Sequence, residues 1–174
     1  MKHFLVQFII LISILIAQKG GEKSISGVYY YQLGLEYAME GNHEQAVESF
    51  KKCLEISPEN ADAHRELAST FKHQGNYSKS IISYEHSLFL NPDSDETNYR
   101  LGVLHHDQGN YDKAILYYKK SIELNTKNHS VYFNLGMIYH NSNYEKAILY
   151  YKKSAQLGNL ESKKWLINNG YSTK

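Results

Sequence analysis

The sequence predicts an all-α protein: an α-solenoid of about four helix hairpins followed by a C-terminal capping helix. The first observation is an internal duplication, in which Tyr111–Ser121 returns as Tyr144–Ser154 with only Asp112 changed, to Glu145. The second is a fixed period of 34 residues, shared by Gly41, Gly75 and Gly109, by the two prolines, and by leucines at 33, 67, 101 and 135. The third is helical spacing of the apolar residues inside each period. Self-similarity at this period is typical of arrays of paired helices.

The N-terminal residues form a separate segment. A short basic start, Met1 to His3, precedes an apolar run from Phe4 to Ala17 that is interrupted only by Gln7 and Ser13. As a helix this run would span about 21 Å, short of the ~30 Å hydrocarbon core of a bilayer. Residues 1–17 are therefore expected to be a signal peptide cleaved after Ala17, or an uncleaved signal anchor. Residues 18–26 are expected to be a flexible linker.

Four repeats then follow in register, predicted at residues 27–60, 61–94, 95–128 and 129–161 of a repeat domain that covers 27–174. In the first repeat, helical spacing from Tyr30 to Ala38 ends at Gly41-Asn42, and a second helix ends before Pro58, because proline cannot continue a helix. The fourth repeat has one residue fewer at its turn. Residues 162–169 predict a capping helix ended by Gly170, with Trp165 and Leu166 turned onto the fourth hairpin.

Small residues recur where the two helices of each hairpin should cross. The small residues of the first helices are Gly34, Ala68, Gly102 and Gly136; those of the second helices are Ala46, Ser80, Ala114 and Ala147. We expect small to face small at each crossing, because this allows close approach of the helices.

The composition argues against several function classes. The chain has 19 Lys and Arg against 18 Asp and Glu, and only two of the cations are arginines, so nothing indicates a nucleic-acid partner. No phosphate loop, zinc-protease helix or nucleophile elbow occurs, and Cys53 lies at an expected core position. The histidines at 73, 106 and 140 fall on successive first helices about 8–10 Å apart, too far to share one metal ion readily. The sequence therefore predicts a protein that is not an enzyme and has no cofactor or metal site.

The aromatic, Leu-Gly, aromatic and Gly positions of the first helices, followed by aromatic, Ala and Pro positions of the second, resemble the tetratricopeptide repeat family over residues 27–161. The tail of the fourth repeat, Ala147 to Asn159, is similar to the related Sel1-like repeats. The resemblance implies a right-handed α-solenoid and a ligand surface on its concave face. Carried over to this chain, the expected partner-binding residues are Tyr31, Leu35, Arg65, Ser69, Lys72, His73, Tyr99, Val103, His106, Phe133, Met137 and His140.

These observations predict a protein–protein interaction adaptor, exported to the periplasm or secreted, or tethered by its N-terminal segment. A protein or peptide segment would lie in the concave groove, with Tyr31, Tyr99, Phe133 and Met137 as anchors and Arg65, Lys72 and Arg100 setting charge preference. Contact with a membrane is expected only if the N-terminal segment is uncleaved. The alternative is a structural or self-associating subunit of an envelope complex, and the oligomeric state stays open.

Overall fold

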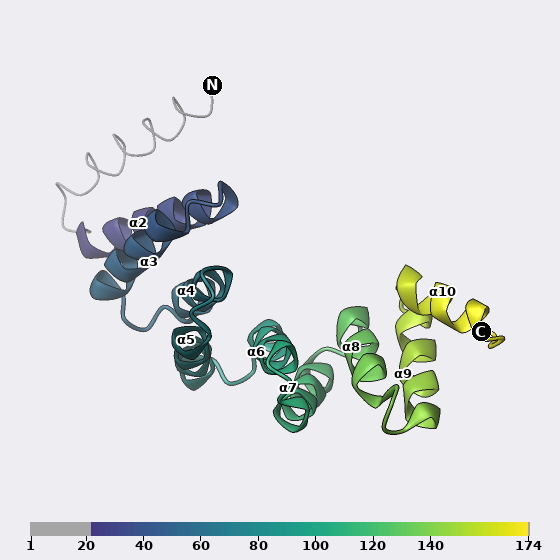
Figure 1. Cartoon of the computed structure of the whole chain (residues 1–174). Coiled ribbons are helices and arrows are strands. Elements are labelled where there is room, and N and C mark those ends of the chain that lie inside the picture. Colours follow the sequence, from purple (N-terminus) through teal and green to yellow (C-terminus); the bar gives the residue numbers. More distant parts are fainter. Residues whose placement is uncertain (1–21, 174) are drawn as a thin grey trace. The chain divides into compact units, whose positions relative to one another are not determined.

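A computed structural model describes residues 22–173, and over this range the chain is a succession of α-helices joined by short turns (Figure 1). Their bounds are α2 Glu22–Met39, α3 His43–Ile56, α4 Ala61–His73, α5 Tyr77–Leu90, α6 Asp95–Asp107, α7 Tyr111–Leu124, α8 His129–Tyr139, α9 Tyr144–Gln156 and α10 Leu160–Asn168. No β-strand occurs within this range, which confirms the predicted all-α helical repeat fold. The expected signal segment, residues 1–17, lies outside the described residues.

The helices divide between two compact units, residues 1–92 and residues 93–174. In the first unit α2 packs on α3, α3 on α4 and α4 on α5. In the second unit α6 packs on α7, α7 on α8, α8 on α9 and α9 on α10. Each hairpin is thus closed by contacts between helices that are neighbours in the sequence, as in a repeat array.

Helix α2 begins at Glu22, so residues 22–26 of the expected linker are helical. Gly27 shows how the helix approaches the rest of the unit: a Cβ atom there would lie 2.6 Å from the side-chain oxygen of Ser57. Gly27 permits this close approach because it has no Cβ atom.

The turns inside the first three hairpins share one geometry. Gly41, Gly75 and Gly109 have φ angles of 78°, 75° and 73°, the left-handed region that glycine adopts without steric cost. The amide of the asparagine after each glycine bonds back to a carbonyl of the preceding helix; for Asn42 this is the carbonyl of Tyr37, at 2.8 Å. This is the Schellman arrangement expected when glycine follows a helix.

The fourth turn is built differently because it has one residue fewer and no glycine. The amide of Asn143 donates to the carbonyl of Tyr139 at 2.8 Å, and its side-chain oxygen accepts from the Lys146 amide at 3.0 Å. Asn110, at the equivalent position of the third hairpin, makes no such side-chain cap. Asn143 therefore caps α9 with its side chain.

The side chains nearest to the glycines across the hairpins are aromatic rings rather than the small residues of the second helices. A Cβ atom on Gly34 would lie 2.6 Å from the ring of Phe50, and one on Gly102 would lie 2.6 Å from the ring of Tyr118. Gly136 meets the ring of Tyr151 in the same way, at 2.7 Å. Each of these glycines leaves a gap on its helix, which we call a glycine notch, and an aromatic ring of the second helix fills it. The ring belongs to the residue one turn after the small residue of that second helix.

The second hairpin keeps the small-to-small contact that was expected. It has Ala68 in place of glycine, and the buried hydroxyl of Ser80 donates to the Ala68 carbonyl at 2.7 Å. Both residues are fully buried.

Helix α10 closes the second unit in the way the sequence predicted. Leu166 is fully buried in a cluster with Ala147, Tyr151 and Ala155, and Trp165 packs on the same cluster. The indole of Trp165 lies 4.3 Å from the ring of Tyr151, centroid to centroid. Gly170 follows with a φ angle of 76°.

Candidate partner-binding surface

The three aromatic anchors predicted on the first helices lie over aromatic rings of the second helices. The centroid of Tyr31 is 6.0 Å from that of Phe50, that of Tyr99 is 6.2 Å from Tyr118, and that of Phe133 is 5.8 Å from Tyr151. All three anchors are half-buried. They therefore cover the rings that fill the glycine notches, and only their outer edges remain for a partner.

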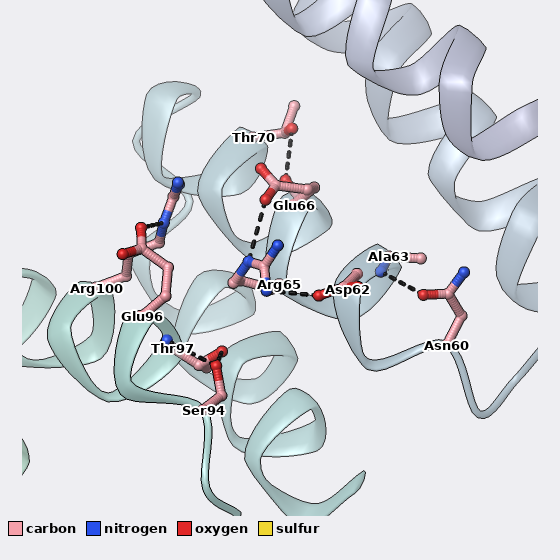
Figure 2. A network of polar contacts seen from close by, with 10 residues as sticks. All are labelled: Asn60, Asp62, Ala63, Arg65, Glu66, Thr70, Ser94, Glu96, Thr97 and Arg100. Carbon is pink, nitrogen blue, oxygen red and sulfur yellow. Dashed lines mark hydrogen bonds and ion pairs between the residues drawn. The ribbon is translucent and has the colours of Figure 1, made fainter. Parts of the chain in front are cut away.

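In the first unit, α2 and α4 bring predicted site residues together around Arg65. The Arg65 guanidinium donates to Asp62 at 2.5 Å and to Glu66 at 3.1 Å (Figure 2). Burial alone lowers the pKa of Arg65, but the two carboxylates more than offset this, and the pKa is raised. The positive charge of Arg65, which was expected to set charge preference, is thus neutralised by two carboxylates of its own helix.

Tyr31 lies close enough to this group to be affected by it. Burial raises the pKa of the Tyr31 hydroxyl, and Glu66 and Asp62 raise it further. Leu35 packs beside Tyr31 in the core cluster of the first unit. Tyr31, Leu35 and Arg65 therefore belong to one surface of this unit, and Ser69 lies half-buried further along α4.

The end of the same surface carries a pair of histidines. The ring of the exposed His73 stacks on that of His43 with a centroid separation of 5.3 Å and an interplanar angle of 7°. Lys72 is half-buried next to it. His43 was not predicted, since it lies at the start of a second helix, where the spacing of one helix gives no signal for it.

In the second unit, predicted residues of α6 pack around Tyr118. Tyr99 and Val103 pack against the buried cluster of Ala114, Tyr118, Val131 and Leu135. The hydroxyl of Tyr118 accepts a hydrogen bond from the Asn134 amide at 3.1 Å. Burial raises the pKa of Tyr118 strongly, with that bond opposing it. Asn134 was missed by the sequence analysis, although its position next to Phe133 could have suggested it.

Arg100 of α6 has a carboxylate partner as well, since its guanidinium donates to Glu96 at 2.6 Å (Figure 2). His106 lies 5.7 Å from the ring of Tyr111 and 6.5 Å from that of Tyr118, centroid to centroid. Arg65 and Arg100 are thus both paired with carboxylates of their own helices.

The final part of the predicted surface is shared with the capping helix. His140 makes edge contacts with Tyr144 and Trp165, each at a centroid distance of 5.6 Å. Met137 is 38% exposed and is the most accessible of the predicted apolar anchors. Trp165 and Tyr171, which stack at 6.2 Å, extend the aromatic surface beyond the first helices.

No three or more His, Cys, Asp or Glu side chains between residues 22 and 173 come together in a way that could hold a metal ion. In the same range, every helix is too short or too polar to span a bilayer.

Comparison with known proteins agrees with the helix pairing. One tetratricopeptide repeat family model matches residues 28–60 and 96–128, and a second matches residues 117–163. A 43-residue segment is 54% identical to the type IV pilus assembly protein PilF of Pseudomonas aeruginosa. That segment covers 25% of this chain and 17% of the pilus protein.

Solved structures show the same fold over longer stretches. The crystal structure of MamA has a TM-score of 0.73 with 24% identity, covering 87% of this chain and 86% of that one. The structure of Pseudomonas aeruginosa PilF has a TM-score of 0.71 with 28% identity, covering 78% of this chain and 63% of that one. Helix hairpins turning at glycine, aromatic rings in glycine notches and the two family models together show that this chain belongs to the tetratricopeptide repeat family.

Proposed function

We propose that the chain is a non-enzymatic adaptor whose first helices bind an apolar segment of a partner protein. Tetratricopeptide repeats form protein-interaction scaffolds, and this is the coarse function that the family assigns. Binding of an apolar segment is supported by one surface of the second unit, which is formed by Tyr99, Val103, Phe133 and Met137. These side chains are aromatic, branched or thioether groups, all half-buried or exposed, and none carries a charge.

The proposed partner segment is apolar and does not need acidic side chains in order to bind. Arg65 and Arg100 already donate to carboxylates on their own helices. A carboxylate of the partner would have to compete with those contacts, so charge contributes little to selection. Aromatic and Met side chains can adapt to an amphipathic helix or an extended segment, which agrees with an apolar ligand.

Site-specific photocrosslinking tests this proposal. A photoreactive amino acid at Met137 is expected to form an adduct with the partner in the native host. The matched control is Leu160, an apolar side chain of α10 that is 65% exposed and lies outside the first helices. Adducts of equal yield from both positions, or from Leu160 alone, would contradict binding by the first helices.

Export of the chain is part of the same proposal. The apolar run of residues 4–17 supports it, and a role in assembly at the cell envelope agrees with the PilF match, whose name is that of a pilus assembly protein. Fractionation of the native host followed by N-terminal sequencing tests it. Recovery from the cytoplasm with Met1 intact would contradict export, and recovery from membranes with residues 1–17 retained would identify an anchor.

A further inference from the structure

Helix α5 of the first unit presents an exposed strip that no part of the proposed partner surface uses. The strip consists of Ile82, Glu85 and Phe89, whose spacing places them on one face of the helix. Ile82 is 58% exposed and Phe89 is 82% exposed, unusually accessible for side chains of this size. An apolar, acidic, apolar sequence therefore faces solvent along this helix, which we call the α5 strip.

Helix α7 of the second unit presents a strip of the same spacing and the opposite pattern. It consists of Lys113, Leu116 and Lys120, all exposed, and Leu116 is 64% exposed. Helix α9 repeats it with Lys146, Leu149 and Lys153, where Leu149 is 67% exposed. We call these the basic strips. The equivalent of Leu116 in α3 is Glu48, so the first hairpin does not have this pattern.

The charges of the two units are complementary as well. Residues 1–92 contain 10 Asp and Glu against 8 Lys and Arg, a net charge of −2, whereas residues 93–174 contain 8 against 11, a net charge of +3. Displacing one strip along the other by one helical turn would place Leu116 against Ile82 or Phe89. The same displacement would place Glu85 against a lysine. Exposed apolar groups with polar neighbours are a feature of interaction surfaces, and opposite charge fixes the register.

We propose that the chain associates head to tail with a second copy of itself, the α5 strip of one copy packing on a basic strip of the next. The two surfaces are different, so the interface is heterologous. Each copy has one α5 strip and two basic strips, so strips remain free through which the association can continue. Each strip consists of three side chains, far fewer than the roughly 20–30 residues that each partner contributes to a stable interface of standard size, so the association is weak. It involves second helices only and does not depend on the proposed binding of a partner by the first helices.

Sedimentation velocity of the full chain tests this proposal. The mean mass is expected to rise between about 10 μM and about 500 μM protein at low salt, and less in about 500 mM salt, where the charge pairs are screened. Phe89→Lys should remove the α5 strip, and the double variant Leu116→Lys, Leu149→Lys should remove both basic strips. All three positions are exposed, so the variants should retain wild-type circular dichroism. Leu160→Lys, a substitution of an equally exposed apolar residue, is the matched control and should associate like the wild type.

The decisive measurement is a mixture of the two variants. Each alone should remain monomeric. The mixture should associate and stop at no more than two copies of the Leu116→Lys, Leu149→Lys variant on one copy of the Phe89→Lys variant, because the first contributes one α5 strip and the second contributes two basic strips. Association of both variants at the wild-type level, or a mixture that stays monomeric, would overturn the proposal. A wild-type monomer at all concentrations would also overturn it. Binding of that monomer to vesicles with anionic phosphatidylglycerol, lost in the Leu116→Lys, Leu149→Lys variant, would then assign the basic strips to lipid.

Discussion

Replacing Gly102 tests whether the glycine notches hold the hairpins together in the way the structure indicates. A Cβ atom at position 102 would lie 2.6 Å from Cδ1 and 2.7 Å from Cε1 of Tyr118. Carbon atoms that are not bonded pack at about 3.5–4.0 Å, so the overlap is about 1 Å. Tyr118 is fully buried and its hydroxyl is held by Asn134, so the ring cannot turn away without moving the helices apart.

Two opposing effects set the magnitude. Overpacking of a filled site costs about 1–3 kcal/mol, whereas exchanging glycine for alanine within a helix stabilises by about 1 kcal/mol through helix propensity. We therefore expect Gly102→Ala to lower the free energy of unfolding by about 1 kcal/mol net. The larger Gly102→Leu should lower it by about 3 kcal/mol, at the upper end of the same range.

Urea unfolding followed by circular dichroism provides the measurement, with Ala68→Gly as the paired variant. Ala68 is the equivalent residue of the second hairpin, where a Cβ atom is already accommodated in the core. Removing that atom should also destabilise the protein, by about 1 kcal/mol, because helix propensity and packing are both lost. A Gly102→Ala variant that is more stable than the wild type would refute the steric argument, since propensity alone would then decide the outcome.

Four further predictions concern separate features. Asn143→Ala should cost about 1 kcal/mol in urea unfolding because it removes the cap on the Lys146 amide, whereas Asn110→Ala, which removes no such cap, should stay within about 0.5 kcal/mol. Trp165→Ala should cost about 2–4 kcal/mol through loss of the packing on Tyr151, and an unchanged melting temperature would contradict the assignment of α10 as a cap. Burial lowers the pKa of His64, His86 lowers it further, and the hydrogen bond with the Pro58 carbonyl opposes both. The folded state should therefore lose stability as the pH falls below the unfolded pKa of about 6.5. An NMR titration of His64 should give a midpoint below that value, and His64→Gln should reduce the loss of stability at low pH. Burial raises the pKa of the Cys53 thiol, so labelling by a thiol reagent at neutral pH should be slow in the native protein and fast in urea; rapid native labelling would contradict its burial.

The helices and their turns could be predicted from the sequence because both depend on local physics. The period of the apolar residues fixes which positions face inward along a helix, and glycine or proline fixes where the helix ends. The start of α2 could not be placed in the same way. Residues 22–26 have a composition that suits a linker, and their helical state accompanies the close approach of Gly27 to Ser57, a contact between residues far apart in the sequence.

The candidate surface could be predicted by position but not by the contacts of its side chains. The positions carried over from the family assign Arg65 and Ser69 to one surface, yet helical spacing could not show that Asp62 and Glu66 would neutralise Arg65. The spacing likewise could not show that the aromatic anchors cover a second-helix ring. How deep such a ring enters depends on the distance between two helices, and the pattern of one helix does not contain that distance.

One correlation among the hairpins links the glycine notches to the chemistry of the partner surface. In the first, third and fourth hairpins an aromatic residue comes three positions before the notch glycine, and it covers the ring that fills the notch: Tyr31 over Phe50, Tyr99 over Tyr118 and Phe133 over Tyr151. In the second hairpin both features change together, with Ala68 in place of the glycine and Arg65 in place of the aromatic residue. The second hairpin still buries a ring at the position equivalent to Phe50, that of Tyr84. What differs there is the residue three positions before the small one, an arginine that two carboxylates of its own helix neutralise.

The same correlation limits how the partner surface can be tested. A truncation such as Tyr99→Ala or Phe133→Ala uncovers a second-helix ring, so any loss of binding would be mixed with a loss of hairpin stability. Met137 is more exposed than the other apolar anchors, and the buried ring of its hairpin, Tyr151, lies next to Phe133. Met137 is therefore the position at which a change in binding reports on the surface itself, which is why the crosslinking experiment is placed there.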